Sequence, residues 1–143
     1  MNKILERILD EHYFKTLTVC GSYRYRNLKE KYQAYYTIKN NLVFAPVNYA
    51  SIKNEVETCR EVALNNVDFL HKIHDKKIML SDAIIVVVGD ECYFGSDTLR
   101  EINFAYENKK IILFSNVPEE EKHKYYFNND ETYPLYMLKE EYK

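Results

Sequence analysis

The chain has 143 residues, a length typical of one domain. Hydrophobic residues make up 46% of it and aromatic residues 15%, a composition that excludes an intrinsically disordered chain. Lys and Arg number 20 against 22 Asp and Glu, so the basic excess usual in proteins that hold duplex nucleic acid is lacking, and we expect no such partner. No apolar run approaches the roughly 20 residues of a membrane span. Three cysteines without metal-ligand spacing favour a reducing compartment. We therefore expect a cytoplasmic protein with no membrane partner.

In chain order, the sequence predicts helices alternating with strands. Apolar residues at helical spacing and β-branched runs mark the two kinds of element. The expected helices cover residues 2–14, 24–40, 55–80 and 97–108, and the expected strands cover 16–20, 42–45, 83–88 and 110–114. In the C-terminal tail, 118–143, residues 134–138 fit either a fifth strand or a docking segment. No repeat or boundary divides the chain, so we expect one domain over 1–143.

This alternation predicts an α/β fold: a doubly wound, flavodoxin- or Rossmann-like, mostly parallel sheet of four to five strands flanked by helices. The unbroken apolar run at 83–88 is typical of a strand covered on both faces. Ligands of such sheets bind beyond the carboxyl ends of the strands. Functional residues are therefore expected in the segments that follow each strand.

The chain has only three glycines, and all of them fall in these segments. Gly21 follows the first strand, Gly89 follows the third, and Gly95 precedes the helix at 97–108. A glycine lets the backbone approach a ligand closely, and Ser22 with the next helix N-terminus offers donors to an anion or a sugar hydroxyl. The same Gly-Ser pair also fits an ordinary turn with Ser22 as the helix cap. The spacing excludes a dinucleotide fingerprint and a P-loop.

Glu101, near the start of the helix at 97–108, has two interpretations. Thr98 and Glu101 fit a capping box, which would make the glutamate structural. Alternatively, Glu101 in the first turn of the helix directs its carboxylate into the cleft, while the Ser96 and Thr98 hydroxyls hold a hydroxyl or a phosphate. Asp82 precedes the third strand and, by residue count, lies at the opposite end of that strand from the loop at 89–95. It fits equally well as the polar residue that ends the long helix at 55–80.

The sequence does not predict a metal site or a cofactor. His71 and His74 lie one helical turn apart but have no third ligand nearby in the sequence. A structural or surface role is expected for both. No cysteine is expected beside a candidate base.

Several segments together resemble a bacterial branch of the nucleoside 2-deoxyribosyltransferase-like superfamily. They are VCGSYR at 19–24, HDKKI at 74–78, SDAIIVV at 81–87, YFGSDTLREI at 93–102 with Ala105, and KKII at 109–112. The resemblance covers roughly residues 16–115. It implies a doubly wound parallel sheet, a nucleoside or nucleotide substrate, no metal or redox cofactor, and a homo-oligomer. Members of the superfamily transfer 2-deoxyribose between bases or hydrolyse nucleoside 5′-monophosphates.

The resemblance also assigns roles to residues. Glu101 matches the glutamate nucleophile, which forms a glycosyl–enzyme intermediate. Asp82 matches an aspartate that contacts the base, and either Asp82 or Asp90 would assist departure of the base. The expected substrate-binding residues are Gly21, Ser22, Arg24, Tyr93, Gly95, Ser96 and Thr98. Better-known members have glycine at the positions of Asp97 and Leu99.

Two other functions fit the same sequence. One is a non-catalytic nucleotide-binding or sensor module of the same fold, which would use the same cleft. The other is an interaction protein that uses its tyrosine-rich C-terminal tail as a contact surface. Turnover of a nucleoside or nucleotide distinguishes the enzyme from both.

Overall fold

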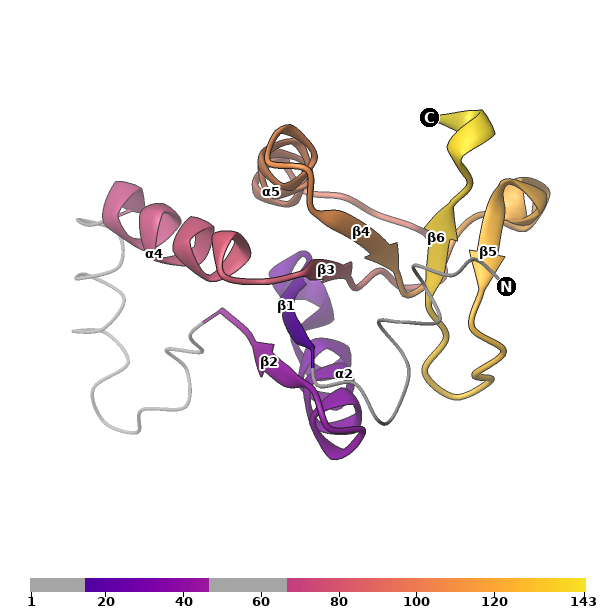
Figure 1. The fold of residues 1–143 in the computed structure, drawn as a ribbon, viewed down its shortest axis with the longest axis horizontal. Helices are drawn as coiled ribbons and strands as arrows, with labels where there is room; N and C mark the ends of the chain where they lie inside the picture. The colour runs from indigo at the N-terminus through magenta and orange to yellow at the C-terminus, as the bar shows by residue number, and fades with distance from the viewer. Residues whose placement is uncertain (1–14, 47–66) are drawn as a thin grey trace.

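The computed structural model describes residues 15–46 and 67–143 (Figure 1). The helix predicted at 2–14, the first part of the helix predicted at 55–80, and Cys59 lie outside the described residues. Within the described ranges, no helix is long and apolar enough to cross a membrane.

The sheet has six strands in the order β2-β1-β3-β4-β6-β5. Its parallel part consists of four strands: β2 (Leu42–Phe44), β1 (Thr16–Cys20), β3 (Ala83–Val86) and β4 (Ile111–Phe114). All four residues of β3 are fully buried. The β-branched, apolar composition of these segments suits a covered parallel sheet, and the structure confirms all four predicted strands.

The C-terminal tail belongs to the same sheet. β6 (Tyr136–Leu138) pairs antiparallel with both β4 and β5 (Tyr125–Phe127). The sheet is therefore mixed and has six strands, so the prediction of four to five strands is wrong. β5 has only three residues and follows the charged 3₁₀ segment η3 (Glu119–Lys124). It is therefore too short for an alternating pattern to predict it.

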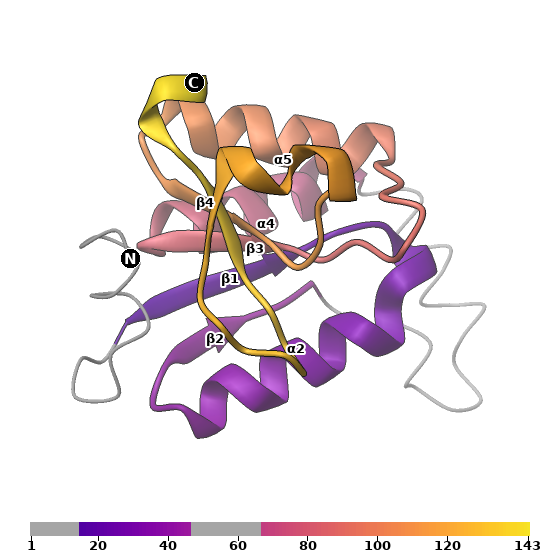
Figure 2. The same cartoon turned by 90° about the vertical axis from the view of Figure 1, so that its right-hand side faces the viewer.

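Helices cover both faces of the sheet (Figures 1 and 2). α2 (Arg26–Ile38), which follows the 3₁₀ turn η1 (Tyr23–Tyr25), lies on one side. α4 (Val67–Met79) and α5 (Ser96–Glu107) lie side by side on the other. The chain ends in a 3₁₀ turn, η4 (Glu140–Tyr142). In this layer α4 packs against β1, and α5 packs against β3 and β4.

Tyrosines of α2 bind the segment between β5 and β6. The Tyr32 hydroxyl donates to the Pro134 carbonyl at 3.0 Å, and the Tyr36 hydroxyl donates to the Tyr133 carbonyl at 2.6 Å. The rings of Tyr32 and Tyr133 meet edge to face. These buried rings supply apolar contact, and their hydrogen-bonded hydroxyls fix how the two segments are oriented. Part of the high tyrosine content therefore has a structural role.

Candidate functional site

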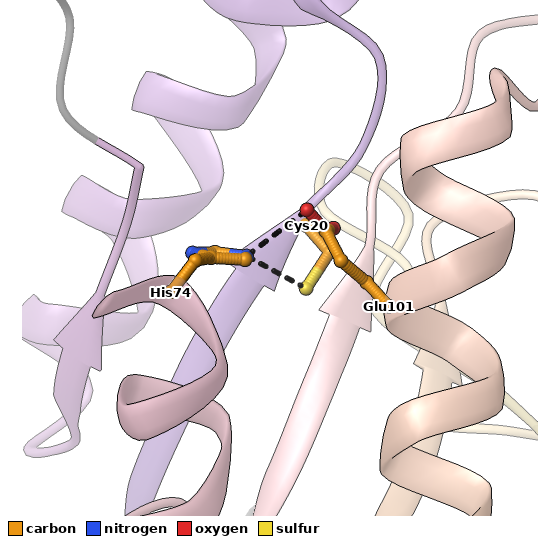
Figure 3. Close-up of side chains that lie close together, drawn as sticks. All are labelled: Cys20, His74 and Glu101. Carbon is orange, nitrogen blue, oxygen red and sulfur yellow. Dashed lines mark hydrogen bonds and ion pairs between the residues drawn. The ribbon is translucent and has the colours of Figure 1, made fainter. Parts of the chain in front are cut away.

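Three side chains from three elements converge at the carboxyl end of β1 (Figure 3). Cys20 is the last residue of β1, His74 lies on α4 and Glu101 lies on α5. His74 Nε2 is 3.5 Å from the Cys20 thiol sulfur and 3.4 Å from Glu101 Oε1. Cys20 is fully buried, and the side chains of His74 and Glu101 are only 9% and 13% exposed. We call these residues the Cys20–His74–Glu101 cluster.

Helical spacing explains why both helices direct a polar side chain inward. His74 lies one turn before Ile78, and Glu101 lies one turn before Ala105. Ile78 and Ala105 are fully buried against the sheet. Residues four apart share a helix face, so His74 and Glu101 lie on the buried faces of α4 and α5.

The cluster is not a nucleophilic cysteine triad. In a triad, the nucleophile and the orienting acid contact opposite ring nitrogens of the histidine. Here the thiol and the carboxylate both face Nε2, and Nδ1 is buried with no partner among the described residues. Burial and the adjacent Glu101 carboxylate also raise the pKa of the Cys20 thiol well above its usual value. The thiol therefore stays protonated near neutral pH and is a poor nucleophile.

A lysine supplies positive charge beside the cluster. The Lys29 ammonium donates to the Gly21 carbonyl at 2.9 Å. Burial lowers the Lys29 pKa, while the charges of Glu101 and Cys20 oppose that shift. The Glu101 carboxylate therefore lies within the electrostatic reach of a cation from the opposite face of the sheet.

An ion pair joins the two helices next to the cluster. Arg100 Nη1 lies 2.9 Å and 3.1 Å from the two carboxylate oxygens of Asp75. Asp75 follows His74 and Arg100 precedes Glu101, so this contact fixes α4 against α5 at the level of the cluster. Holding two functional side chains through their neighbours limits their movement.

The structure also brings the predicted residues Arg24 and Tyr93 together. The Arg24 guanidinium lies 3.9 Å from the centre of the Tyr93 ring and 3.6 Å from Glu91. The Tyr25 hydroxyl donates to the Glu91 carboxylate at 2.7 Å, and this contact lowers the Glu91 pKa. The loops that follow β1 and β3 are thus joined, as expected for segments at one edge of a parallel sheet.

Two of the three glycines have structural reasons. Gly21 has φ +143°, and a Cβ there would lie 2.6 Å from the Val87 carbonyl oxygen. A Cβ on Gly89 would lie 2.7 Å from the Tyr25 ring. A Cβ on Gly95 would make only ordinary contacts, the nearest to the Tyr93 hydroxyl at 3.8 Å, and Gly95 is the N-cap of α5. Close packing of the loops therefore explains Gly21 and Gly89 without a ligand.

The remaining predicted residues occupy varied positions. Ser22 caps η1, since its hydroxyl accepts from the Arg24 amide at 3.3 Å, which is the capping interpretation. Asp90 and Ser96 are exposed, in the turn after β3 and at the first residue of α5. Thr98 is the third residue of α5 and is buried.

The predicted capping box is wrong. The N-cap of α5 is Gly95, and no side chain of the described residues caps it. Because the helix begins at Ser96, Glu101 lies in its second turn and not in the first. The Glu101 side chain therefore faces the cluster and not the helix N-terminus.

Asp82 lies away from the cluster. It precedes β3, and its carboxylate accepts from the Thr16 amide at 3.0 Å, at the amino end of β1. Cys20 pairs with Val86 at the other end of the same two strands, about 13 Å further along at the usual rise per residue. The structure does not bring Asp82 and Glu101 together, and we leave Asp82 out of the mechanism proposed below.

We expect Asp82→Asn to have a small effect. The amide side chain keeps an acceptor for the Thr16 amide, so the free energy of unfolding in urea should change by no more than about 1 kcal/mol. If the variant acts on a nucleoside, the rate of base release should match that of the parent protein. A large loss of rate with unchanged stability would return Asp82 to the site.

Sequence reasoning missed Cys20, His74 and Lys29. The expectation that no cysteine lies beside a candidate base is wrong, because Cys20 contacts His74 across 54 positions of sequence. One signal was present: His74 lies on the same helix stripe as Leu70 and Ile78, where a polar residue needs a partner. The identity of the residue that contacts His74 depends on the strand order, which the sequence does not show.

A sizeable groove among the described residues lies away from the cluster. It has a volume of about 760 Å³ and runs between α5, β4 and the C-terminal segment, with Tyr106, Phe114 and Met137 in its lining. None of the three cluster residues lines it. Its lining is mostly apolar, with charged side chains such as those of Glu107 and Lys110.

Comparison with known proteins adds no family assignment: no protein-family model matches the chain, and no curated protein matches it significantly. The superfamily resemblance over residues 16–115 therefore stays a prediction.

Proposed function

We propose that the protein cleaves or exchanges the N-glycosidic bond of a nucleoside or nucleoside 5′-monophosphate, with Glu101 as the nucleophile. The observation that carries this proposal is the position of the Glu101 carboxylate. It lies at the carboxyl end of the parallel strands, is 13% exposed, and faces His74 at 3.4 Å with Lys29 nearby. A carboxylate held this way has few alternative rotamers and can present a lone pair in a fixed direction.

The topology supports a ligand at this place. We interpret the parallel part of the sheet as doubly wound, with α2 on one face and α4 and α5 on the other. β1 and β3 are neighbours, and the chain leaves them in opposite directions, toward β2 and toward β4. Such a reversal point is where open α/β sheets bind ligands. Cys20, the last residue of β1, lies there and contacts the cluster.

In the proposed reaction, a Glu101 carboxylate oxygen attacks the anomeric carbon as the bond to the base nitrogen breaks. The base leaves with the bonding electron pair and takes up a proton from water, while the exposed Asp90 is the candidate to hydrogen-bond the departing base. Water, or a second base, then attacks the glycosyl ester and releases Glu101 with net retention. His74 and Lys29 lie where they can stabilise the carboxylate that leaves in this second step.

Substrate contacts are proposed at the two joined loops. Arg24 and Tyr93 form a cationic and aromatic surface on the segments that follow β1 and β3, suited to a phosphate or a base. Asp97 is 74% exposed in the first turn of α5, where its charge opposes a phosphate at the helix N-terminus. A 5′-phosphate is therefore more readily placed at Arg24 than at α5. As in the resembled superfamily, we propose a homo-oligomer.

The test is a panel of nucleosides and their 5′-monophosphates, incubated with the protein with and without an acceptor base and resolved by chromatography. We expect free base in the absence of acceptor, or an exchanged nucleoside in its presence, at a rate proportional to protein concentration. Absence of both products across the panel would contradict the proposal.

Binding without turnover is the second candidate, and one observation favours it. Glu101 is already engaged by His74 and is mostly covered, whereas attack requires a sugar carbon within about 3–3.5 Å of the carboxylate. Equilibrium dialysis of the same panel distinguishes the two functions. Stoichiometric binding of a ligand that is recovered unchanged would establish the binding module and exclude the enzyme.

A further inference from the structure

The Cys20–His74–Glu101 cluster presents one sulfur, one nitrogen and one oxygen donor toward a common point (Figure 3). All the candidate ligand atoms lie within 4.8 Å of one another. We propose that these three residues form a zinc site, and that Zn²⁺ bound there blocks Glu101. The second half of this proposal rests on the function proposed above, whereas the first half does not.

The distances match those that a tetrahedral zinc ion imposes on its ligands. Zn–S bonds of about 2.3 Å and Zn–N and Zn–O bonds of about 2.0–2.2 Å place sulfur and nitrogen about 3.6 Å apart, and nitrogen and oxygen about 3.4 Å apart. The corresponding separations in the cluster are 3.5 Å and 3.4 Å, both measured from His74 Nε2. The third separation, between the Cys20 sulfur and the Glu101 carboxylate, lies within 4.8 Å.

Hydrogen bonding explains the same geometry less well. An N–H···O bond usually spans about 2.7–3.2 Å, so 3.4 Å from Nε2 to Glu101 Oε1 is long. One ring nitrogen faces two partners, and it carries at most one hydrogen to share between them. A cation between the three atoms would satisfy all of them at once.

Charge balance also favours a dication. With Cys20 as a thiolate and Glu101 as a carboxylate, the cluster would hold two negative charges in a nearly closed space. One Zn²⁺ neutralises both charges, and its binding releases the thiol proton.

The donor set determines which metal fits. Thiolate and imidazole favour Zn²⁺ and related transition metals over Mg²⁺ and Ca²⁺, which prefer oxygen ligands. Three protein ligands leave a fourth position of a tetrahedron for water. In that state the Glu101 lone pair points at the metal, so the carboxylate cannot attack a sugar.

Two neighbouring cations, Lys29 and Arg100, interact with Cys20, and Lys29 allows a test of the direction of the effect. Lys29 interacts electrostatically with both Cys20 and Glu101, and a bound dication would be repelled by its ammonium. Lys29→Met removes that repulsion without touching a ligand atom. We therefore expect this variant to bind zinc more tightly than the parent protein.

The experiment measures metal binding directly, on protein freed of metal by a chelator. The background carries Cys59→Ser and Cys92→Ser, so that Cys20 is the only thiol. We expect one Zn²⁺ per chain by isothermal titration calorimetry, and a Co²⁺ complex with a thiolate-to-cobalt charge-transfer band. Mg²⁺ and Ca²⁺ should not compete.

Variants locate the ligands. We expect a large loss of zinc affinity in each of three ligand variants, Cys20→Ser, His74→Ala and Glu101→Gln. The loss should exceed the roughly 10- to 100-fold that removal of an outer-shell partner costs. Cys20→Ser should also remove the charge-transfer band. His71→Ala is the matched control, because His71 lies on the same helix beside the exposed Asp97, at 3.6 Å. No stoichiometric binding, or binding that survives Cys20→Ser and is lost in His71→Ala, would overturn the site.

Inhibition of base release by zinc is measured in a separate experiment. If the parent protein releases base, one equivalent of Zn²⁺ should abolish the release and a chelator should restore it. Undiminished turnover with zinc bound would overturn the blocking role and leave the site standing. Zinc binding in a protein that turns over no nucleoside would contradict the proposed function and not the site, so the two failures are distinguishable.

Discussion

Glu101→Gln is expected to abolish release of free base while the protein stays folded. The amide is nearly isosteric with the carboxylate but has no anionic oxygen to attack the anomeric carbon, and loss of a covalent nucleophile costs about 10³-fold or more. The measurement is the initial rate of base release from whichever panel member the parent protein turns over. Circular dichroism and urea unfolding report on the fold of the same sample.

A matched control comes from the same helix. Glu107 is exposed at the last turn of α5, and Glu107→Gln removes the same charge without touching the cluster. It should keep the parent rate. Glu101→Ala with added azide is a second control, because the small anion can attack the sugar in place of the missing carboxylate and give a glycosyl azide. Unchanged base release by Glu101→Gln would contradict the nucleophile assignment.

Gly21→Ala is expected to destabilise the protein by about 2–4 kcal/mol. Gly21 has φ +143°, a conformation that L side chains rarely adopt, and its new Cβ would lie 2.6 Å from the Val87 carbonyl oxygen. That oxygen belongs to backbone fixed beside β1 by the bond from the Val87 amide to the Cys20 carbonyl, at 2.8 Å. Neither the new Cβ nor the Val87 carbonyl oxygen can move away without disturbing the backbone. The free energy of unfolding in urea should therefore fall.

Gly95→Ala is the control for this substitution. The nearest atom to a Cβ at Gly95 is the Tyr93 hydroxyl oxygen at 3.8 Å, an ordinary contact. Alanine is a poorer N-cap than glycine, so we expect a loss of less than about 1 kcal/mol. Equal losses for Gly21→Ala and Gly95→Ala would show that the close approach of the loops after β1 and β3 does not limit stability.

Local patterns were enough to predict most elements of the fold. β3 was recognisable from its unbroken apolar run, and α5 was placed to within one residue at each end. The hairpin of β5 and β6 was harder, because β5 has only three residues and its pairing depends on contacts with the rest of the sheet. Strand number was therefore underestimated where local signals are weakest.

The site was predicted in part. Glu101 was identified as a candidate, but its neighbours Cys20 and His74 were not, because their contact spans 54 positions and follows from the strand order. A sequence shows which residues lie on the buried face of a helix, while the sheet topology decides which residues face each other across the helices. Asp82 lies at the far end of β3 from the cluster, as its position before the strand already indicated.

The most direct test of the central claim is the covalent state of Glu101 during turnover. Protein mixed with a panel nucleoside whose deglycosylation is slowed by a 2-fluoro substituent on the sugar should be quenched and digested, and its peptides examined by mass spectrometry. We predict a mass increase equal to one glycosyl group on the peptide that contains Glu101, and none in Glu101→Gln. Base release without any adduct on Glu101, or with the sugar attached elsewhere, would contradict the proposed mechanism.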